Sequence, residues 1–160
     1  MMDASVFDQL NSIYITMHNK CVELCQYLRE KGCKVSSGFY NNHSKKINDD
    51  YATEYFPIPV ISVESVGDIG IDIDNLWLEV VLSKENALKI DYNTLADKYS
   101  FEIYGVENYL SDMFNKHINL LEIENNIKQS EETRVCIAFD LPFDVNVDEI
   151  LAISQSLHLL

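Results

Sequence analysis

The chain has 160 residues, and 47% of them are apolar. A chain of this length can bury about two-thirds of its unfolded surface in one core. Its 26 acidic residues outnumber its 12 basic ones, giving a formal net charge of −14. This balance argues against nucleic-acid binding, because Lys and Arg carry that affinity. No apolar run reaches the roughly 18 residues that a membrane helix needs. We therefore expect a single globular domain over residues 1–160, without nucleic-acid or membrane partners.

The N-terminal residues and the cysteines both indicate a cytoplasmic protein. The sequence MMDASVFDQL lacks the basic start and the apolar centre of a signal peptide. A disulfide framework in a small secreted domain is usually shorter and denser in cysteine, and CxxC spacing is absent here. We expect reduced, mostly buried thiols at the four cysteine positions, which are Cys21, Cys25, Cys33 and Cys136.

Apolar residues spaced alternately three and four apart predict a long N-terminal helix of about 26 residues. Ser5 and Asp8 resemble a capping box at its start, and Gly32 is a plausible end. The stripe consists of Phe7, Leu10, Tyr14, Met17, Cys21, Leu24 and Leu28. After the helix, residues 33–40 are typical of a short strand and the polar residues 41–51 of a surface loop.

Residues 57–82, PIPVISVESVGDIGIDIDNLWLEVVL, predict three successive strands, because apolar and polar side chains alternate with a period of two. A two-residue turn at Asp74-Asn75 would pair Ile71 with Leu78. A three-residue loop over residues 66–68 would pair Val63 with Ile71 and place Gly67 or Asp68 in the left-handed conformation. Both turns keep the apolar residues of the three strands on one face.

In that register the other face of the meander carries the candidate site. Glu64, Gly70 and Glu79 form one predicted row, and Ser62, Asp72 and Trp77 form the next. The candidate partner- or ligand-binding residues are therefore Trp77, Glu64, Asp72 and Glu79. Acidic residues on a wet sheet face are also common without any function.

The rest of the chain predicts further helices and two more strands. Ser83 and Asp91 are candidate caps for short helices that end near Lys98. Residues 101–104 and 134–141 read as strands, the second of them apolar enough to be covered on both faces. Residues 106–128 read as a helix with His117 on its apolar side, and Asn146 with Glu149 predicts a cap for a terminal helix.

Motifs for cofactors and metals are absent from the sequence. It contains no Gly-rich phosphate loop, GxSxG, HExxH or calcium loop. His18, Cys21 and Cys25 fall at i, i+3 and i+7, but Cys21 belongs to the apolar stripe, so we interpret the cysteines as buried hydrophobes rather than zinc ligands. We expect no cofactor and no metal.

The order of elements predicts an α+β fold, a mainly antiparallel sheet built on the meander of about residues 59–82 with helices packed on one face. For function, the first hypothesis is a non-enzymatic interaction domain that binds a basic protein partner around Trp77. The alternative is a small metal-dependent or carboxylate-based enzyme, or a ligand-binding domain, that uses Glu64, Asp72 and Glu79. In size, charge and predicted compartment the chain resembles bacterial immunity proteins and antitoxins, a similarity of composition that carries no motif and transfers no residues. The sequence leaves the oligomeric state open.

Overall fold

The computed structural model describes residues 4–40, 58–107 and 120–158. Within these ranges six strands form one antiparallel sheet in the order β1-β2-β3-β4-β6-β5. The strands are β1 (Val35–Tyr40), β2 (Ile58–Val63), β3 (Gly67–Ile71), β4 (Asn75–Ser83), β5 (Ser100–Gly105) and β6 (Arg134–Pro142). The predicted meander is therefore β2-β3-β4, in the middle of the sheet.

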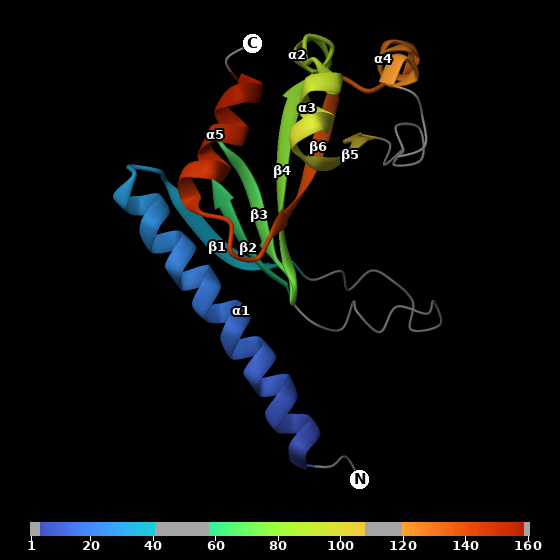
Figure 1. Cartoon of the computed structure of the whole chain (residues 1–160). Helices are drawn as coiled ribbons and strands as arrows, with labels where there is room; N and C mark the ends of the chain where they lie inside the picture. The colour runs from blue at the N-terminus through green and yellow to red at the C-terminus, as the bar shows by residue number, and fades with distance from the viewer. Residues whose placement is uncertain (1–3, 41–57, 108–119, 159–160) are drawn as a thin grey trace.

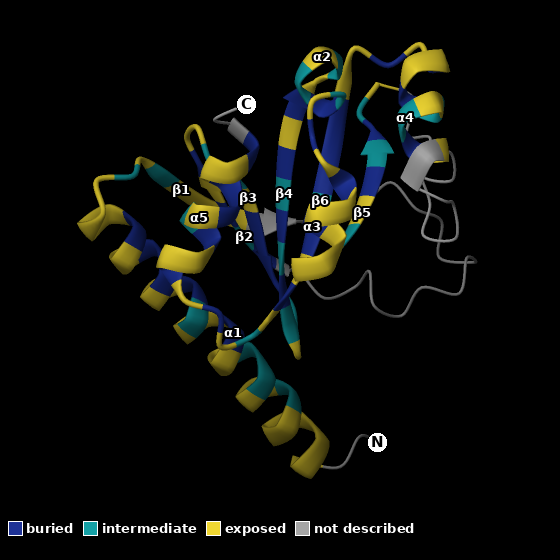
Figure 2. Cartoon of the chain, turned by 45° about the horizontal axis from the view of Figure 1, so that its top comes forward, coloured by how far each residue is buried: buried dark blue, intermediate teal, exposed yellow. Residues whose placement is uncertain are grey.

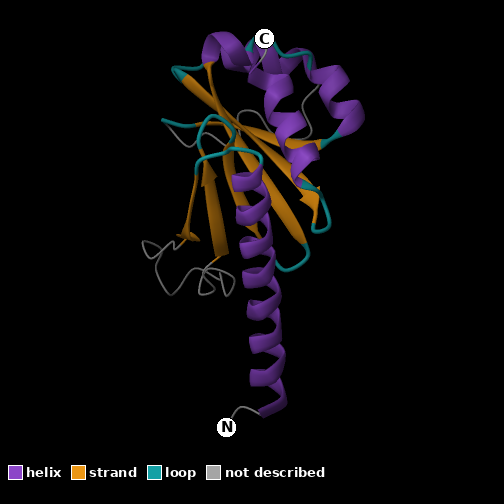
Figure 3. Cartoon of the chain, turned by 90° about the vertical axis from the view of Figure 1, so that its left-hand side faces the viewer, coloured by secondary structure: helices purple, strands orange, loops and turns teal. Residues whose placement is uncertain are grey.

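The described helices all contribute buried side chains to one core on one side of the sheet. They are α1 (Ala4–Glu30), α2 (Lys84–Ala87), α3 (Tyr92–Lys98), α4 (Leu120–Gln129) and α5 (Val147–His158). Figure 3 views the molecule from this side, with α1 and α5 in front of the strands. The predicted α+β class, with helices on one face, is confirmed.

The core follows from the period-2 alternation of the strands. One apolar row runs from Ile61 to Ile69, Leu78 and Phe139 on neighbouring strands, and each of these side chains is almost completely buried. Burial of side chains of this size contributes about 1.5–3 kcal/mol each. Figure 2 shows the same pattern as buried segments along the central strands.

Both pairings of the meander differ from the predicted register, the β3–β4 pairing by two residues and the β2–β3 pairing by four. Ile71 pairs with Leu76, and Ile69 pairs with Leu78, so the β3–β4 turn lies around Ile73, which is 54% exposed. The backbone N–H of Asp72 donates to the carbonyl of Asn75 at 3.0 Å and closes this turn. A shift by an even number of residues leaves every side chain on the same face, which is why the apolar faces were predicted correctly.

The β2–β3 loop has the predicted length but consists of Glu64, Ser65 and Val66, because Val63 pairs with Gly67. Ser65 takes the left-handed conformation with φ 64°, where the sequence pointed to Gly67 or Asp68. Gly67 does adopt a positive φ of 143°, and its Cα lies against the carbonyl of Glu79, which leaves no room for a side chain.

Several helix ends agree with the predicted caps. The Ser83 hydroxyl accepts from the Asn86 backbone at 3.2 Å, and Asp91 accepts from Thr94. Asn146 accepts from the backbone of Glu149 at 2.8 Å. The helix α1 begins at Ala4, so Ser5 lies inside it rather than at its cap.

The predicted helix over residues 106–128 is described only in part. The strand β5 ends at Gly105, and α4 covers Leu120–Gln129. His117 and the predicted loop over residues 41–51 lie outside the described residues. The predicted terminal helix is α5, and the predicted strand at 33–40 is β1, in which Gly38 pairs regularly with Val60.

Candidate functional site

The candidate site is the sheet face opposite the core, which we call the outer face. Its described strand positions form two main rows, because residues that pair across strands share a face. One row runs Ser36, Ser62, Asp68, Glu79, Ala138 and Glu102, and the next runs Gly38, Val60, Gly70, Trp77, Asp140 and Ser100.

Trp77 occupies the middle of the second row and is partly exposed. It pairs with Gly70 on β3 and with Asp140 on β6. Its indole covers the bare Cα of Gly70, with Cε2, Cζ2 and Nε1 at the place that a Cβ would otherwise fill. Gly70 is buried by this contact, so the glycine sets where the indole lies. The Asp140 carboxylate also accepts a hydrogen bond from the side-chain amide of Asn75.

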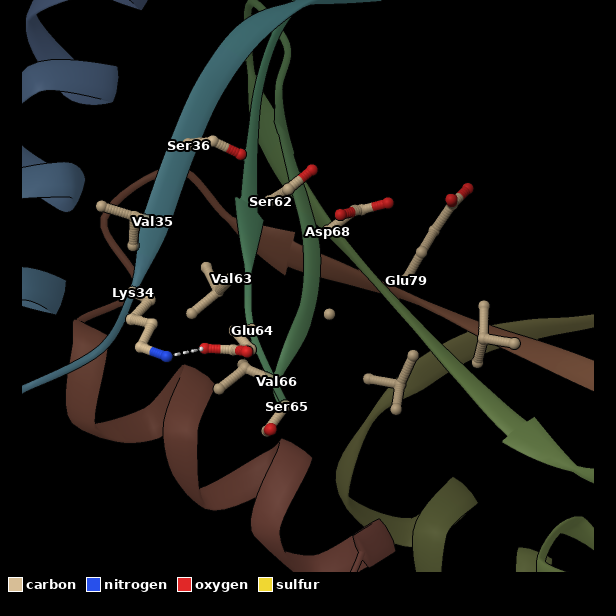
Figure 4. A pocket seen from close by; sticks show the side chains of 13 residues that line it. Lys34, Val35, Ser36, Ser62, Val63, Glu64, Ser65, Val66, Asp68 and Glu79 are labelled. Atoms are coloured by element: carbon tan, nitrogen blue, oxygen red, sulfur yellow. Dashed lines mark ion pairs between the residues drawn. The ribbon is translucent and has the colours of Figure 1, made fainter.

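Four residues of the first row line a shallow depression of about 640 Å³ beside the β2–β3 loop. Figure 4 shows Ser36, Ser62, Asp68 and Glu79 side by side on four strands, with their oxygen atoms on the same side of the sheet. Lys34 and Glu64 form an ion pair of 3.0 Å at the edge of the depression. The depression therefore offers two hydroxyl groups and two carboxylates in a line.

Glu79 is the acidic residue of the row with the most perturbed environment. Burial raises the pKa of Glu79, the hydrogen bond from Tyr104 lowers it, and the nearby Asp68 raises it, with a net upward shift. The Tyr104 hydroxyl donates to Oε1 of Glu79 at 2.5 Å. The carboxylate is thus oriented by β5, although it belongs to β4.

Tyr104 on β5 and Cys136 on β6 pair with each other and lie at a less accessible part of the outer face. Burial is the main cause that raises the pKa of Tyr104, and burial also raises the pKa of Cys136 to about 12. Cys136 is 2% exposed. Because the reactive form of cysteine is the thiolate, this thiol is unreactive at neutral pH.

We predict that Glu79→Gln changes the pH dependence of stability. The raised pKa means that native Glu79 binds its proton more tightly than the unfolded chain does, so its contribution to the free energy of unfolding falls as pH rises above about 4.5. Glutamine keeps an acceptor for Tyr104 without the charge. Between pH 4 and pH 7, the melting temperature of the variant minus that of the wild type should increase as pH rises. A decrease of this value toward pH 7 would contradict the assigned environment.

The outer face carries a clear excess of negative charge. Its strand positions hold Asp68, Glu79, Glu102 and Asp140, against Arg134 at the end of β6 among the described residues. Nε of Arg134 is 3.1 Å from Glu107, so its charge is already compensated. Ion pairs as exposed as this contribute little stability.

The structure brings together two of the four candidate residues from the sequence. Trp77 and Glu79 lie on the outer face in adjacent rows. Glu64 lies in the β2–β3 loop and pairs with Lys34, while Asp72 lies at the opposite end of β3, where it accepts from the backbone of Ile73 at 2.7 Å. The predicted rows were therefore wrong, because they depended on the register of the two turns.

Sequence reasoning missed Asp68 and Asp140 as members of the site. Asp68 was placed in a loop by the shifted register, and it pairs with Glu79 in the structure. Asp140 was read as part of a strand covered on both faces, yet it is exposed beside Trp77. The alternation of Cys136, Ala138 and Asp140 with the core residues of β6 was the signal that could have placed Asp140 on the outer face.

The described part of the chain contains no cluster of side chains suited to bind a metal ion. No group of three or more His, Cys, Asp or Glu side chains there is arranged to hold a metal ion. Of the three acids in the alternative hypothesis of a carboxylate site, Glu64 and Glu79 line the same depression, whereas Asp72 lies at the other end of β3. No helix in the described ranges is long and apolar enough to cross a membrane.

The fold and the site together define an α+β protein with one helix-covered sheet face and one acidic face. The chain belongs to the DUF3201 family, described as proteins of unknown function, over residues 8–153. A conserved hypothetical protein from Pyrococcus furiosus has a similar structure, with a TM-score of 0.73 and 20% sequence identity. The match covers 96% of this chain and 99% of that one and shows the shared fold. No curated protein matches the sequence.

Proposed function

We propose that this protein is a non-enzymatic interaction protein that binds a basic protein partner on its outer face. The observation that carries the proposal is the position of the partly exposed Trp77 between carboxylates, with Asp140 directly opposite it and Glu79 in the next row. Aromatic anchors surrounded by polar residues are typical of the side chains that dominate interfaces. We also propose a cytoplasmic location for the protein, which the three buried thiols support.

The chemistry of this surface favours a guanidinium or ammonium group. One side of the Trp77 indole rests on Gly70, so a cation can stack on the other side. Asp140 is placed to accept hydrogen bonds from the same cation, and a carboxylate binds Arg in a bidentate manner. The row of Asp68 and Glu79 continues the negative surface toward the depression. A net charge of −14 also speeds the approach of a basic partner.

Two charge-reversed variants test the proposal with an Arg- and Lys-rich peptide of about ten residues as the probe. Binding can be followed by the fluorescence of Trp77, since the chain has a single tryptophan. Asp68→Lys with Asp140→Lys should weaken peptide binding at least about tenfold, equivalent to about 1.4 kcal/mol. Binding of the wild type should also weaken as salt rises, because exposed charges are screened.

Asp97→Lys with Asp144→Lys is the matched control, because both residues are exposed and neither lies on the outer face. Each pair of substitutions adds four charges and changes −14 to −10. The control variant should bind the peptide within about twofold of the wild type. Equal weakening of both variants would show that net charge alone attracts the peptide, and would overturn the outer face as the site.

A further inference from the structure

Asn75 restrains the carboxylate of Asp140 beside the Trp77 indole. The side-chain amide of Asn75, at the start of β4, donates to Oδ1 of Asp140 on β6. The carbonyl of Asn75 also accepts the hydrogen bond from Asp72 that closes the β3–β4 turn, so the donor is itself fixed to the sheet. The strands β3, β4 and β6 lie side by side in the middle of that sheet (Figure 1). An exposed carboxylate thus has a partner that limits its rotation.

The pairing of β4 with β6 brings Asp140 close to Trp77. The backbone N–H of Lys84 donates to the carbonyl of Thr133, which makes these two residues a hydrogen-bonded pair. Hydrogen-bonded and non-hydrogen-bonded pairs alternate along an antiparallel ladder. Trp77 and Asp140 lie seven residues from that pair on their strands, so they form a non-hydrogen-bonded pair. Side chains approach more closely in pairs of this kind, in which the Cα atoms are about 4.5 Å apart.

The geometry around the indole suits a flat cation better than a compact one. Gly70 covers one side of the Trp77 ring system, and the partly exposed residue offers the other. The guanidinium group of arginine is planar and carries its N–H donors in a fixed fork, whereas the ammonium group of lysine is compact, strongly hydrated and free to rotate. A stacked guanidinium can direct its donors to the carboxylate of Asp140 at the same time.

We propose that the outer face selects arginine over lysine in its partner, and that Asn75 is the positioning residue for this selectivity. The inference rests on the proposed function and specifies the side chain that the basic partner places on Trp77. A forked donor requires the two carboxylate oxygens in a fixed orientation, which the amide of Asn75 maintains. A lysine ammonium group can follow a carboxylate that rotates, so it gains little from the restraint.

Two peptides that differ only in their basic residues test the selectivity. Each has about ten residues and alternates glycine with arginine in one peptide and with lysine in the other, so their length and charge are equal. Calorimetric titration of the full chain should show the arginine peptide binding at least about threefold more tightly. This preference should remain at high salt, although screening weakens the binding of both peptides. The ring current of Trp77 should also shift the arginine side-chain protons upfield in NMR spectra of the complex.

Asn75→Ala tests the role of the side-chain amide. The variant should bind the lysine peptide as the wild type does and lose most of its preference for the arginine peptide. Alanine keeps the backbone carbonyl that closes the β3–β4 turn, and a melting temperature near that of the wild type would verify this. Asn93→Ala is the matched control, because Asn93 is exposed on α3, on the helix-covered side of the sheet. This variant should keep the affinities for both peptides.

The outcomes separate this inference from the proposed function. Equal affinities of the two peptides for the wild type, with the Trp77 signal still changing, would overturn the selectivity and leave the outer face as the binding surface. Absence of binding by either peptide would overturn the proposed function and the selectivity together. An equal loss of both peptides in Asn75→Ala, or equal effects of Asn75→Ala and Asn93→Ala, would overturn the positioning role of Asn75.

Discussion

Leu78→Ala is expected to lower the free energy of unfolding by about 2–5 kcal/mol, the largest effect that we predict for a single substitution. Leu78 is completely buried and pairs with Ile69 on one side and Phe139 on the other, so it stands in the middle of the apolar row. Truncation removes apolar contacts and leaves a cavity that the neighbouring strands cannot fill. Urea denaturation of the wild type and the variant measures the difference.

Val81→Ala on the same strand provides the control for that measurement. Val81 lies on the outer face and is 45% exposed, so its truncation should cost less than about 1 kcal/mol. The comparison tests which face of β4 is the core face. A loss below about 1 kcal/mol for Leu78→Ala would contradict the arrangement.

Gly70→Ala is the substitution with the second largest expected effect. A Cβ at Gly70 would occupy the place of the Trp77 ring, so the indole must move off the sheet. We expect a loss of about 1–3 kcal/mol, as for other overpacked sites. The displaced indole should be more exposed to water, and its fluorescence emission should move to longer wavelength.

Gly38→Ala isolates the effect of this contact. Gly38 belongs to the same row of the outer face, but a Cβ there meets no atom within 4 Å. The substitution should be close to neutral, or slightly stabilising through the lower entropy of the unfolded chain. Equal losses in the two alanine variants would mean that the indole does not rest on Gly70.

The faces of the strands could be predicted from sequence because they depend only on the alternation of side chains. Ile69, Ile71 and Leu78 were placed on the core side and are buried there. Ile73 continues the same alternation, yet it lies in a turn and is exposed. Alternation cannot tell where a strand stops, and the hydrogen bond from Asp72 to Asn75 decides it here.

The rows across the sheet were harder to predict, because a shift of two residues keeps each face and changes every partner. Trp77 was therefore placed beside Asp72, whereas its partners are Gly70 and Asp140. The position of Asp140 opposite Trp77 depends on the pairing of β6 with β4, and these two residues are 63 positions apart in sequence. Local patterns carry no information about such a pairing.

The N-terminal part of α1 illustrates a different limit. The apolar stripe correctly predicted one long helix, which runs from Ala4 to Glu30. The first residue of that stripe, Phe7, is 57% exposed, whereas Leu24 and Leu28 near the other end are buried. The periodicity specifies the side of the helix that is apolar, and the size of the sheet beneath it determines how much of that side is covered.

The most direct test of the proposed function is an NMR map of the binding site for the Arg- and Lys-rich peptide. Chemical-shift changes in the backbone amides should concentrate on β3, β4 and β6 around Gly70, Trp77 and Asp140, together with the indole N–H of Trp77. Changes spread over the helix-covered side, or an unchanged Trp77 signal at saturating peptide, would contradict the outer face as the binding surface.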